Sequence, residues 1–156
     1  MAKRTAGILL FREAPGGLEV LLVHSGGPFW ARKDEGAWTI PKGLVDEGEE
    51  PFDAAKREFR EETGGSPDGE AIALQPLRQP SGKVIHAWAL RGAFDPATLT
   101  SNTFLMEWPP GSGQQREFPE VDRAGWFSME EAGRKILKGQ APLLRDLLRK
   151  LNGLPG

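Results

Sequence analysis

The segment from Gly43 to Gly65, GLVDEGEEPFDAAKREFREETGG, constrains this chain more than any other. Its centre predicts a helix, because Pro51 suits a first helical turn and the two glycines at its end supply a stop. Within the helix an apolar stripe recurs at helical spacing: Phe52, Ala55 and Phe59. A buried face of this kind predicts that the helix packs on a sheet or on other helices.

Three carboxylates of this helix, Glu58, Glu61 and Glu62, fall within an arc of about 100° beside the apolar stripe. Acids at the margin of a core repel one another and lose solvation, so they require positive charge nearby. Arg57 supplies only one such charge. Mg²⁺ or Mn²⁺, which prefer carboxylate oxygens, would supply the rest. The alternative for a charged run is a solvated acidic face that pairs with neighbouring lysine and arginine side chains.

The residues that flank the acids favour the metal site. The spacing of eight residues is that of the Nudix box: Gly43, Glu49, Arg57, Glu58, Phe59, Glu61, Glu62 and Gly64. The chain therefore resembles the Nudix hydrolases. One position departs from the pattern, because Gly65 stands where the family has a hydrophobic residue, and we expect a less firmly anchored loop there.

The composition is that of one soluble domain, residues 1–156, with 38% hydrophobic and 27% charged residues. A net charge of −2 argues against a general nucleic-acid binder or a binder of anionic membranes. The absence of cysteine excludes disulfides, thiolate metal sites and cysteine nucleophiles. No stretch is long enough to span a membrane, and we expect a cytoplasmic location.

Apolar and alternating runs predict strands at residues 5–12, 18–24, 37–40, 71–77, 83–91, 103–108 and 124–127. Two further helices are predicted at 128–138, capped by Ser128, and at 142–151, with a leucine face at 143, 144, 147, 148 and 151. Residues 111–118 are predicted to be a flexible loop. This order indicates an α/β or α+β domain, and the resemblance implies the Nudix α/β/α sandwich with a mixed sheet.

The resemblance also implies an activity, the metal-dependent hydrolysis of a nucleoside diphosphate linked to another group. It assigns Glu58 and Glu62 as metal ligands and Glu61 as either a further ligand or the base that activates water. The carbonyl group of Gly43 would add a ligand. Glu49 and Arg57 correspond to a pair that braces the loop against the helix.

Family members often add an acid from a later loop. Two residues of this chain could supply it, Glu117 and Glu120. We favour Glu120, which lies just ahead of the last predicted strand.

Four side chains outside the box are candidate substrate contacts. Lys42 comes immediately before the box, where a cation could meet a phosphate. Phe29 and Trp30 lie in a predicted loop, where they either pack on the core or form a flap over a nucleobase. His86 is either a core histidine or a substrate contact, whereas His24 is expected to be structural or solvent-facing.

The sequence narrows the substrate, a small-molecule nucleotide, only in part. The WTIPKG run before the box resembles members that hydrolyse dinucleoside polyphosphates or nucleoside triphosphates, which we rank first. ADP-ribose or a nucleotide sugar comes second, on a faint similarity at Pro80. A nucleotide-binding Nudix module without catalysis is the alternative of a different class, and the complete set of box acids argues against it. The sequence predicts no oligomeric state.

Overall fold

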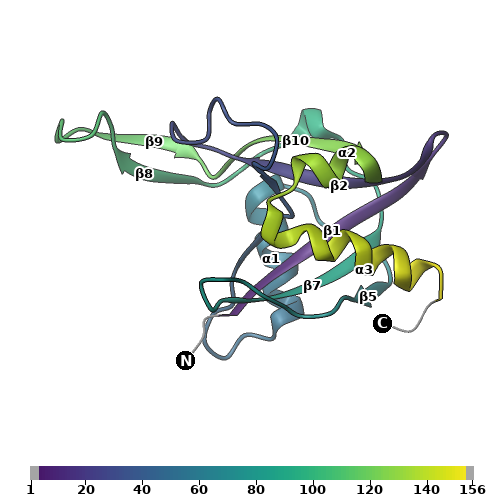
Figure 1. Cartoon of the computed structure of the whole chain (residues 1–156). Coiled ribbons are helices and arrows are strands. Elements are labelled where there is room, and N and C mark those ends of the chain that lie inside the picture. Colours follow the sequence, from purple (N-terminus) through teal and green to yellow (C-terminus); the bar gives the residue numbers. More distant parts are fainter. Residues whose placement is uncertain (1–3, 154–156) are drawn as a thin grey trace.

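The computed structural model describes residues 4–153, which form a central mixed sheet with helices on both faces (Figure 1). Five strands run in the order β10-β2-β1-β7-β5: β10 (Val121–Ser128), β2 (Gly17–Ser25), β1 (Arg4–Ala14), β7 (Val84–Arg91) and β5 (Ala71–Ala73). Three short strands pair beside them: β3 (Trp38–Thr39) with β2, β4 (Lys42–Leu44) with β1, and β6 (Leu77–Arg78) with β7. β1 and β7 are parallel, and the other pairs are antiparallel.

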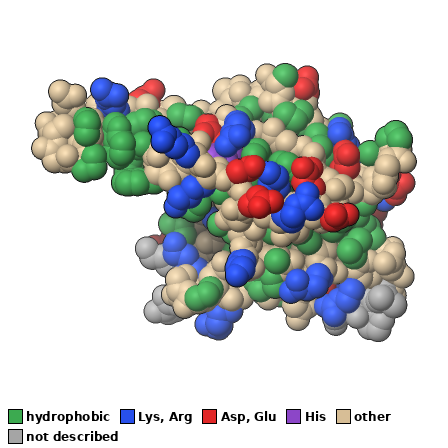
Figure 2. Space-filling model, turned by 45° about the horizontal axis from the view of Figure 1, so that its top comes forward, with side chains coloured by type: hydrophobic (Ala, Val, Ile, Leu, Met, Phe, Trp, Pro, Cys, Tyr) green, Lys and Arg blue, Asp and Glu red, His purple; other side chains and the backbone are tan. Residues whose placement is uncertain are grey.

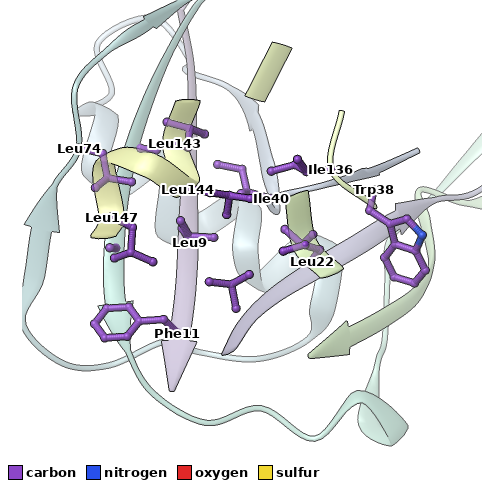
Figure 3. Packing of buried hydrophobic residues seen from close by; sticks show 14 of the residues in the cluster. Leu9, Phe11, Leu22, Trp38, Ile40, Leu74, Ile136, Leu143, Leu144 and Leu147 are labelled. Atoms are coloured by element: carbon purple, nitrogen blue, oxygen red, sulfur yellow. The ribbon is translucent and has the colours of Figure 1, made fainter. Parts of the chain in front are cut away.

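The helices divide between the two faces of the sheet, as predicted for an α/β/α sandwich. α1 (Pro51–Thr63) packs on the face that carries Ala6, Ile8 and Leu10 of β1. α2 (Met129–Lys135), the 3-10 turn η2 (Lys138–Gln140) and α3 (Ala141–Leu151) follow β10. Residues of α2 and α3 pack on the other face, where Figure 3 shows Leu143, Leu144 and Leu147 of α3 near Leu9 and Phe11. Among the described residues, the helices are too short or too polar to cross a membrane.

A two-stranded hairpin projects from this body (Figure 1). It consists of β8 (Thr103–Glu107) and β9 (Gln115–Pro119), with Phe104 opposite Phe118. Hydrophobic side chains gather along this arm in Figure 2. The prediction of a loop at 111–118 was therefore wrong for its second half, because the polar run QREF forms a strand on the surface, where only one face needs apolar residues.

Other details of the predicted elements also differ from the structure. The strand predicted at 71–77 is split into β5 and β6, because the backbone N–H of Gln75 donates to Asp146 Oδ2 (2.7 Å) instead of to a strand. α2 ends at Lys135, three residues early, since Ile136 becomes extended and bridges Trp38. The leucine face of α3 is narrower than predicted, with Leu148 40% exposed. A 3-10 turn, η1 (Pro96–Thr98), forms in the segment before β8.

The end of α1 is better anchored than the sequence suggested. Gly64 ends the helix with a φ of 81°, a left-handed conformation that favours glycine. A Cβ atom at Gly65 would lie 2.9 Å from the ring of Phe94, which packs edge-on against Phe59 at 6.2 Å. The Phe94 ring therefore fills the space of the missing hydrophobic side chain, and the backbone N–H of Gly65 also donates to Thr63 Oγ1 (3.0 Å).

Candidate active site

The box residues form a compact unit because α1 lies directly against β4. A Cβ atom at Gly43 would overlap the Glu58 carboxylate, so a glycine is required at this point of close approach. The Glu58 side chain is only 12% exposed as a result. The close approach of α1 to β4 thus explains why the box has a glycine at position 43.

Arg57 is the centre of the polar network on this face. Its Nε and Nη2 atoms donate to the two carboxylate oxygens of Glu49, at 2.9 and 3.0 Å. Its Nη1 atom donates to Glu58 Oε1 (2.9 Å) and to the Glu61 carboxylate, and Nη2 also donates to the carbonyl oxygen of Leu44 (3.0 Å). Arg57 therefore joins the loop before α1 to two acids of the helix, as the resemblance implied for the pair with Glu49.

These contacts move the pKa values of both partners. The hydrogen bonds from Arg57 lower the pKa of Glu49 to about 2. The same pairing with Glu49 raises the pKa of Arg57. The pair is therefore charged on both sides at neutral pH.

Glu62 has a different environment, because no cationic side chain of residues 4–153 is hydrogen-bonded to it. Its Oε1 atom accepts the backbone N–H of Lys42 at 3.2 Å. Burial raises its pKa to about 8, and repulsion from Glu58 and Glu120 adds to this effect, while the ammonium group of Lys42 opposes it. Burial likewise raises the pKa of Glu58, although Arg57 opposes the shift.

Three backbone hydrogen bonds bring Glu120 beside the box. The N–H of Asn102 donates to the carbonyl of Glu61 (2.8 Å), the N–H of Glu120 to the carbonyl of Asn102 (2.8 Å), and the N–H of Gly26 to the carbonyl of Glu120 (2.9 Å). Burial and repulsion from Glu61 raise the pKa of the Glu120 carboxyl group. Glu120 thus lies within electrostatic range of the acids of α1.

Glu117 is placed differently. It is exposed on β9, where it is paired with Leu105 of the projecting hairpin.

We therefore expect Glu120→Gln to lower turnover by about a hundredfold or more, because an acid at the site loses its charge. Glu117→Gln, the matched control with the same change of charge, should stay within about twofold in a steady-state assay. Equal and small effects of the two substitutions would remove Glu120 from the site.

The aromatic candidates in the loop after β2 separate into two kinds. Trp30 packs against the core, and the Lys33 ammonium group lies 5.0 Å from its ring. Phe29 is 58% exposed and contacts the ring of Trp108 edge-on, with 5.6 Å between ring centroids. Trp108 is not among the residues that the sequence indicates as substrate contacts, because nothing in the sequence pairs the hairpin with this loop.

Among the described residues, neither histidine forms a hydrogen bond or an ion pair with the acids of α1. His24 is fully buried, with Nδ1 2.8 Å from Asp122 Oδ1 and Nε2 2.6 Å from the carbonyl oxygen of Lys33, so its expected structural role is confirmed. His86 is half-buried on β7, opposite Ala6, and burial lowers the pKa of its ring. Its strand face is that of Trp88, which packs on Phe52 of α1.

The donor set suits a hard divalent cation. Glu58, Glu62 and Glu120 supply carboxylate oxygens, and burial raises the pKa of each, as expected for acids that lack sufficient positive charge. Within residues 4–153, however, no three acidic or histidine side chains converge into a ready-formed metal-binding group. Arg57 instead holds Glu58 and Glu61, so a bound cation would compete with its guanidinium group.

Comparison with known proteins places this geometry in a family. Residues 1–151 match the family described as NUDIX domain. Nudix hydrolase 10 of Arabidopsis thaliana is 30% identical over 112 residues, which cover 72% of this chain and 36% of that protein. The asymmetrical bis(5′-nucleosyl)-tetraphosphatase of Caenorhabditis elegans is 39% identical over 62 residues, which cover 40% of this chain and 41% of that protein.

A third curated relative, the RNA pyrophosphohydrolase of Bartonella henselae, is 38% identical over 66 residues, which cover 40% of this chain and 35% of that protein. The aligned segments therefore span less than half of these relatives. Among solved structures, a binary complex of the C. elegans Ap4A hydrolase has a TM-score of 0.67 and 25% identity, over 96% of this chain and 99% of that one. The NUDIX domain of Shewanella oneidensis NrtR with ADP ribose has a TM-score of 0.68 and 18% identity, over 97% of this chain and 89% of that one, a likeness of fold alone.

Proposed function

The chain belongs to the Nudix family, and we propose on that premise that it is a metal-dependent pyrophosphohydrolase. Its substrate would be a nucleoside diphosphate linked to another group, with dinucleoside polyphosphates or nucleoside triphosphates ranked first. The similarity in sequence to the C. elegans tetraphosphatase and the similarity in fold to the C. elegans Ap4A hydrolase support this ranking. The observation that carries the proposal is that Arg57 holds Glu58 and Glu61, while Glu62 and Glu120 lie within electrostatic range of these acids.

The bound cation and the side chains of the protein would have different roles in the reaction. Mg²⁺ or Mn²⁺, held by Glu58, Glu62 and Glu120 and by the carbonyl group of Gly43, would supply positive charge to the phosphate oxygens and acidify the attacking water. Burial destabilises the charged form of these carboxylates. A bound cation would offset this loss of hydration, so burial of the acids favours cation binding.

The side chains of this chain position and deprotonate the reactants. The Glu61 side chain is 36% exposed, against 12% for Glu58, so a water molecule can reach it. We assign Glu61 as the base that accepts the proton of this water, while the oxygen attacks phosphorus and the bridging P–O bond breaks. Arg57 holds Glu61 in place from the adjacent turn. The ammonium group of Lys42, next to Glu62, is available to a phosphate oxygen of the substrate.

The proposal predicts an absolute requirement for a divalent cation. Purified protein should cleave at least one substrate in a panel of nucleoside triphosphates, dinucleoside polyphosphates, ADP-ribose, NADH and nucleotide sugars with Mg²⁺ or Mn²⁺, and none in excess EDTA. Mass spectrometry of the products identifies the broken bond. Full turnover in EDTA would refute the mechanism.

The same panel decides between the alternatives. Preferential cleavage of ADP-ribose would favour the second-ranked substrate. Binding of nucleotides without cleavage of any of them would favour a non-catalytic module, for which calorimetry without turnover is the direct measurement.

A further inference from the structure

The projecting hairpin of β8 and β9 has an open edge. Within residues 4–153, the two strands form a sheet of their own, and the outer edge of β8 pairs with no other strand. A two-stranded hairpin without further partners is only marginally stable in water. Hydrophobic side chains gather along this arm in Figure 2, and Leu105, at the middle of β8, is 67% exposed. The arm therefore has the geometry and the apolar surface of an interaction site.

Hydrogen bonds at both ends of the hairpin show which backbone groups of β8 point away from β9. At the tip, the N–H of Trp108 donates to the carbonyl oxygen of Gln114 (2.9 Å). At the base, the N–H of Glu120 donates to the carbonyl oxygen of Asn102 (2.8 Å). Bonded and unbonded positions alternate along an antiparallel pair, so the even-numbered residues of β8 are bonded to β9. The N–H and C=O groups of the remaining three residues point outward: Thr103, Leu105 and Glu107.

These outward groups form an unfilled hydrogen-bonding edge. None of them has a hydrogen-bond partner in the part of the chain that the structure describes. A row of this kind is a template on which another extended strand can pair. The side chains of β8 then decide which strand fits.

The sequence of β8 is complementary to itself across a two-fold axis. A second, antiparallel β8 can add to this edge only where outward-directed residues face each other. With the axis at Leu105, this leucine lies opposite its own copy, and Thr103 lies opposite Glu107 of the second copy. Phe104 then lies opposite Met106 on the other face. Apolar groups meet apolar groups and a hydroxyl meets a carboxylate, so like charges are nowhere opposed.

The outer edge of β9 does not suit the same pairing. Its outward-directed positions include Pro119, which has no N–H donor. The base of this edge is also covered, because a Cβ atom at Gly26 would overlap the carbonyl oxygen of Pro119. A two-fold axis at Arg116 or Glu117 would place like charges opposite each other. One edge of the hairpin is thus protected against pairing, whereas the other is open.

We propose that β8 is an interface between two copies of this chain, which pair edge to edge into a four-stranded sheet in the order β9-β8-β8-β9. The arrangement uses the same surface on both copies, so it closes as a dimer. The contact spans only the 5 residues of β8 in each copy. It is smaller than a standard interface, and we expect a dissociation constant of about 10–100 µM. Pairing of the arms requires neither metal nor substrate, so the inference goes beyond the proposed function.

A cysteine at the two-fold axis tests the register. The chain has no cysteine, so Leu105→Cys introduces a single thiol. In the proposed dimer the two thiols face each other with Cα atoms about 5.5 Å apart, a separation that a disulfide spans. We expect Leu105→Cys to form a covalent dimer under mild oxidation at about 100 µM protein. Glu117→Cys, the exposed control on the other strand of the hairpin, should remain largely monomeric on a non-reducing gel.

Sedimentation equilibrium from about 5 µM to about 1 mM protein measures the non-covalent dimer. Leu105→Lys places two cations opposite each other and should weaken dimerisation by about tenfold or more. Leu148→Lys makes the same change at an exposed leucine of α3, and its dissociation constant should stay within about twofold of wild type. Far-UV circular dichroism confirms that each variant is folded.

Three results would each overturn the proposal. The wild type could remain monomeric up to about 1 mM. Leu105→Lys and Leu148→Lys could dimerise equally well, or Glu117→Cys could form a disulfide as readily as Leu105→Cys. Hydrolysis in the substrate panel is measured separately, so the proposed enzymatic function and the dimer can fail independently of each other.

Discussion

Glu62→Gln is expected to lower hydrolysis by about a hundredfold or more while raising the melting temperature of the metal-free protein at pH 8 and above. The substitution keeps the size of the side chain and its helix propensity. It removes the negative charge that burial opposes most strongly, since the pKa of Glu62 is raised to about 8. The loss of activity and the gain of stability would then both result from replacing this one carboxylate with an amide.

The direction of the pH dependence follows from that pKa. The unfolded chain loses the Glu62 proton near pH 4.5, whereas the folded chain holds it to about pH 8. Over this interval the folded state binds more protons, so the stability of the metal-free wild type falls as the pH rises. Each pKa unit corresponds to about 1.4 kcal/mol, and relaxation of the neighbouring groups leaves an expected gain for the variant of about 2–4 kcal/mol above pH 8. For a domain of this size that is about 5–10 °C.

Thermal unfolding in EDTA from pH 5 to pH 9 measures this effect. The difference between Glu62→Gln and wild type should grow with pH, and added Mg²⁺ should stabilise the variant less than wild type. Glu117→Gln, which removes an exposed carboxylate, is the control and should show neither effect. A clear fall in the metal-free melting temperature of Glu62→Gln at pH 8 would mean that the carboxylate is held by a structural contact.

Arg57→Ala is expected to lower stability and activity together. The guanidinium group holds Glu49, Glu58 and Glu61, and its removal leaves Glu58 buried without its cationic partner. We expect a fall of about 5 °C or more in melting temperature at pH 7 and a loss of turnover of at least about a hundredfold. The side chains are partly solvated, which limits the loss of stability.

The dependence of this loss on pH tests its cause. The pKa of Glu49 is lowered to about 2 by Arg57, so the contribution of this pair is fully present above about pH 4.5 and is lost as the pH falls toward 2. The difference between wild type and Arg57→Ala should therefore shrink in acid. Arg57→Lys keeps the charge but loses the two-pronged geometry, and should lie between them. A melting temperature for Arg57→Ala equal to that of wild type would contradict the bracing role.

The parts of the fold that the sequence predicted well depend on local signals. Helix α1 is bounded by Pro51 and Gly64, and its apolar stripe faces the sheet, as the spacing of Phe52, Ala55 and Phe59 indicated. The two faces of β7 were also predicted correctly from the sequence, because side chains of a strand alternate between its faces.

The parts that could not be predicted depend on contacts between distant segments. Phe94 replaces a side chain absent at Gly65, yet the two are far apart in sequence and no periodicity relates them. Trp108 meets Phe29 only because the hairpin folds toward the loop after β2. Gln79, in the loop after β6, donates to the carbonyl oxygen of Gly139 in η2 (3.0 Å), a contact that no pattern in either segment specifies.

Three of the bonds that position Glu120 are between backbone groups: Asn102 to Glu61, Glu120 to Asn102, and Gly26 to Glu120. Peptide groups are the same in every residue, so this attachment does not depend on the side chains of the arm between residues 102 and 120. The arm can consequently change in sequence and length over evolution while the carboxylate at its base keeps its place. Proline at residue 102 or 120 would remove an N–H donor. At residue 26 any side chain is excluded, because a Cβ atom at Gly26 would overlap the carbonyl oxygen of Pro119.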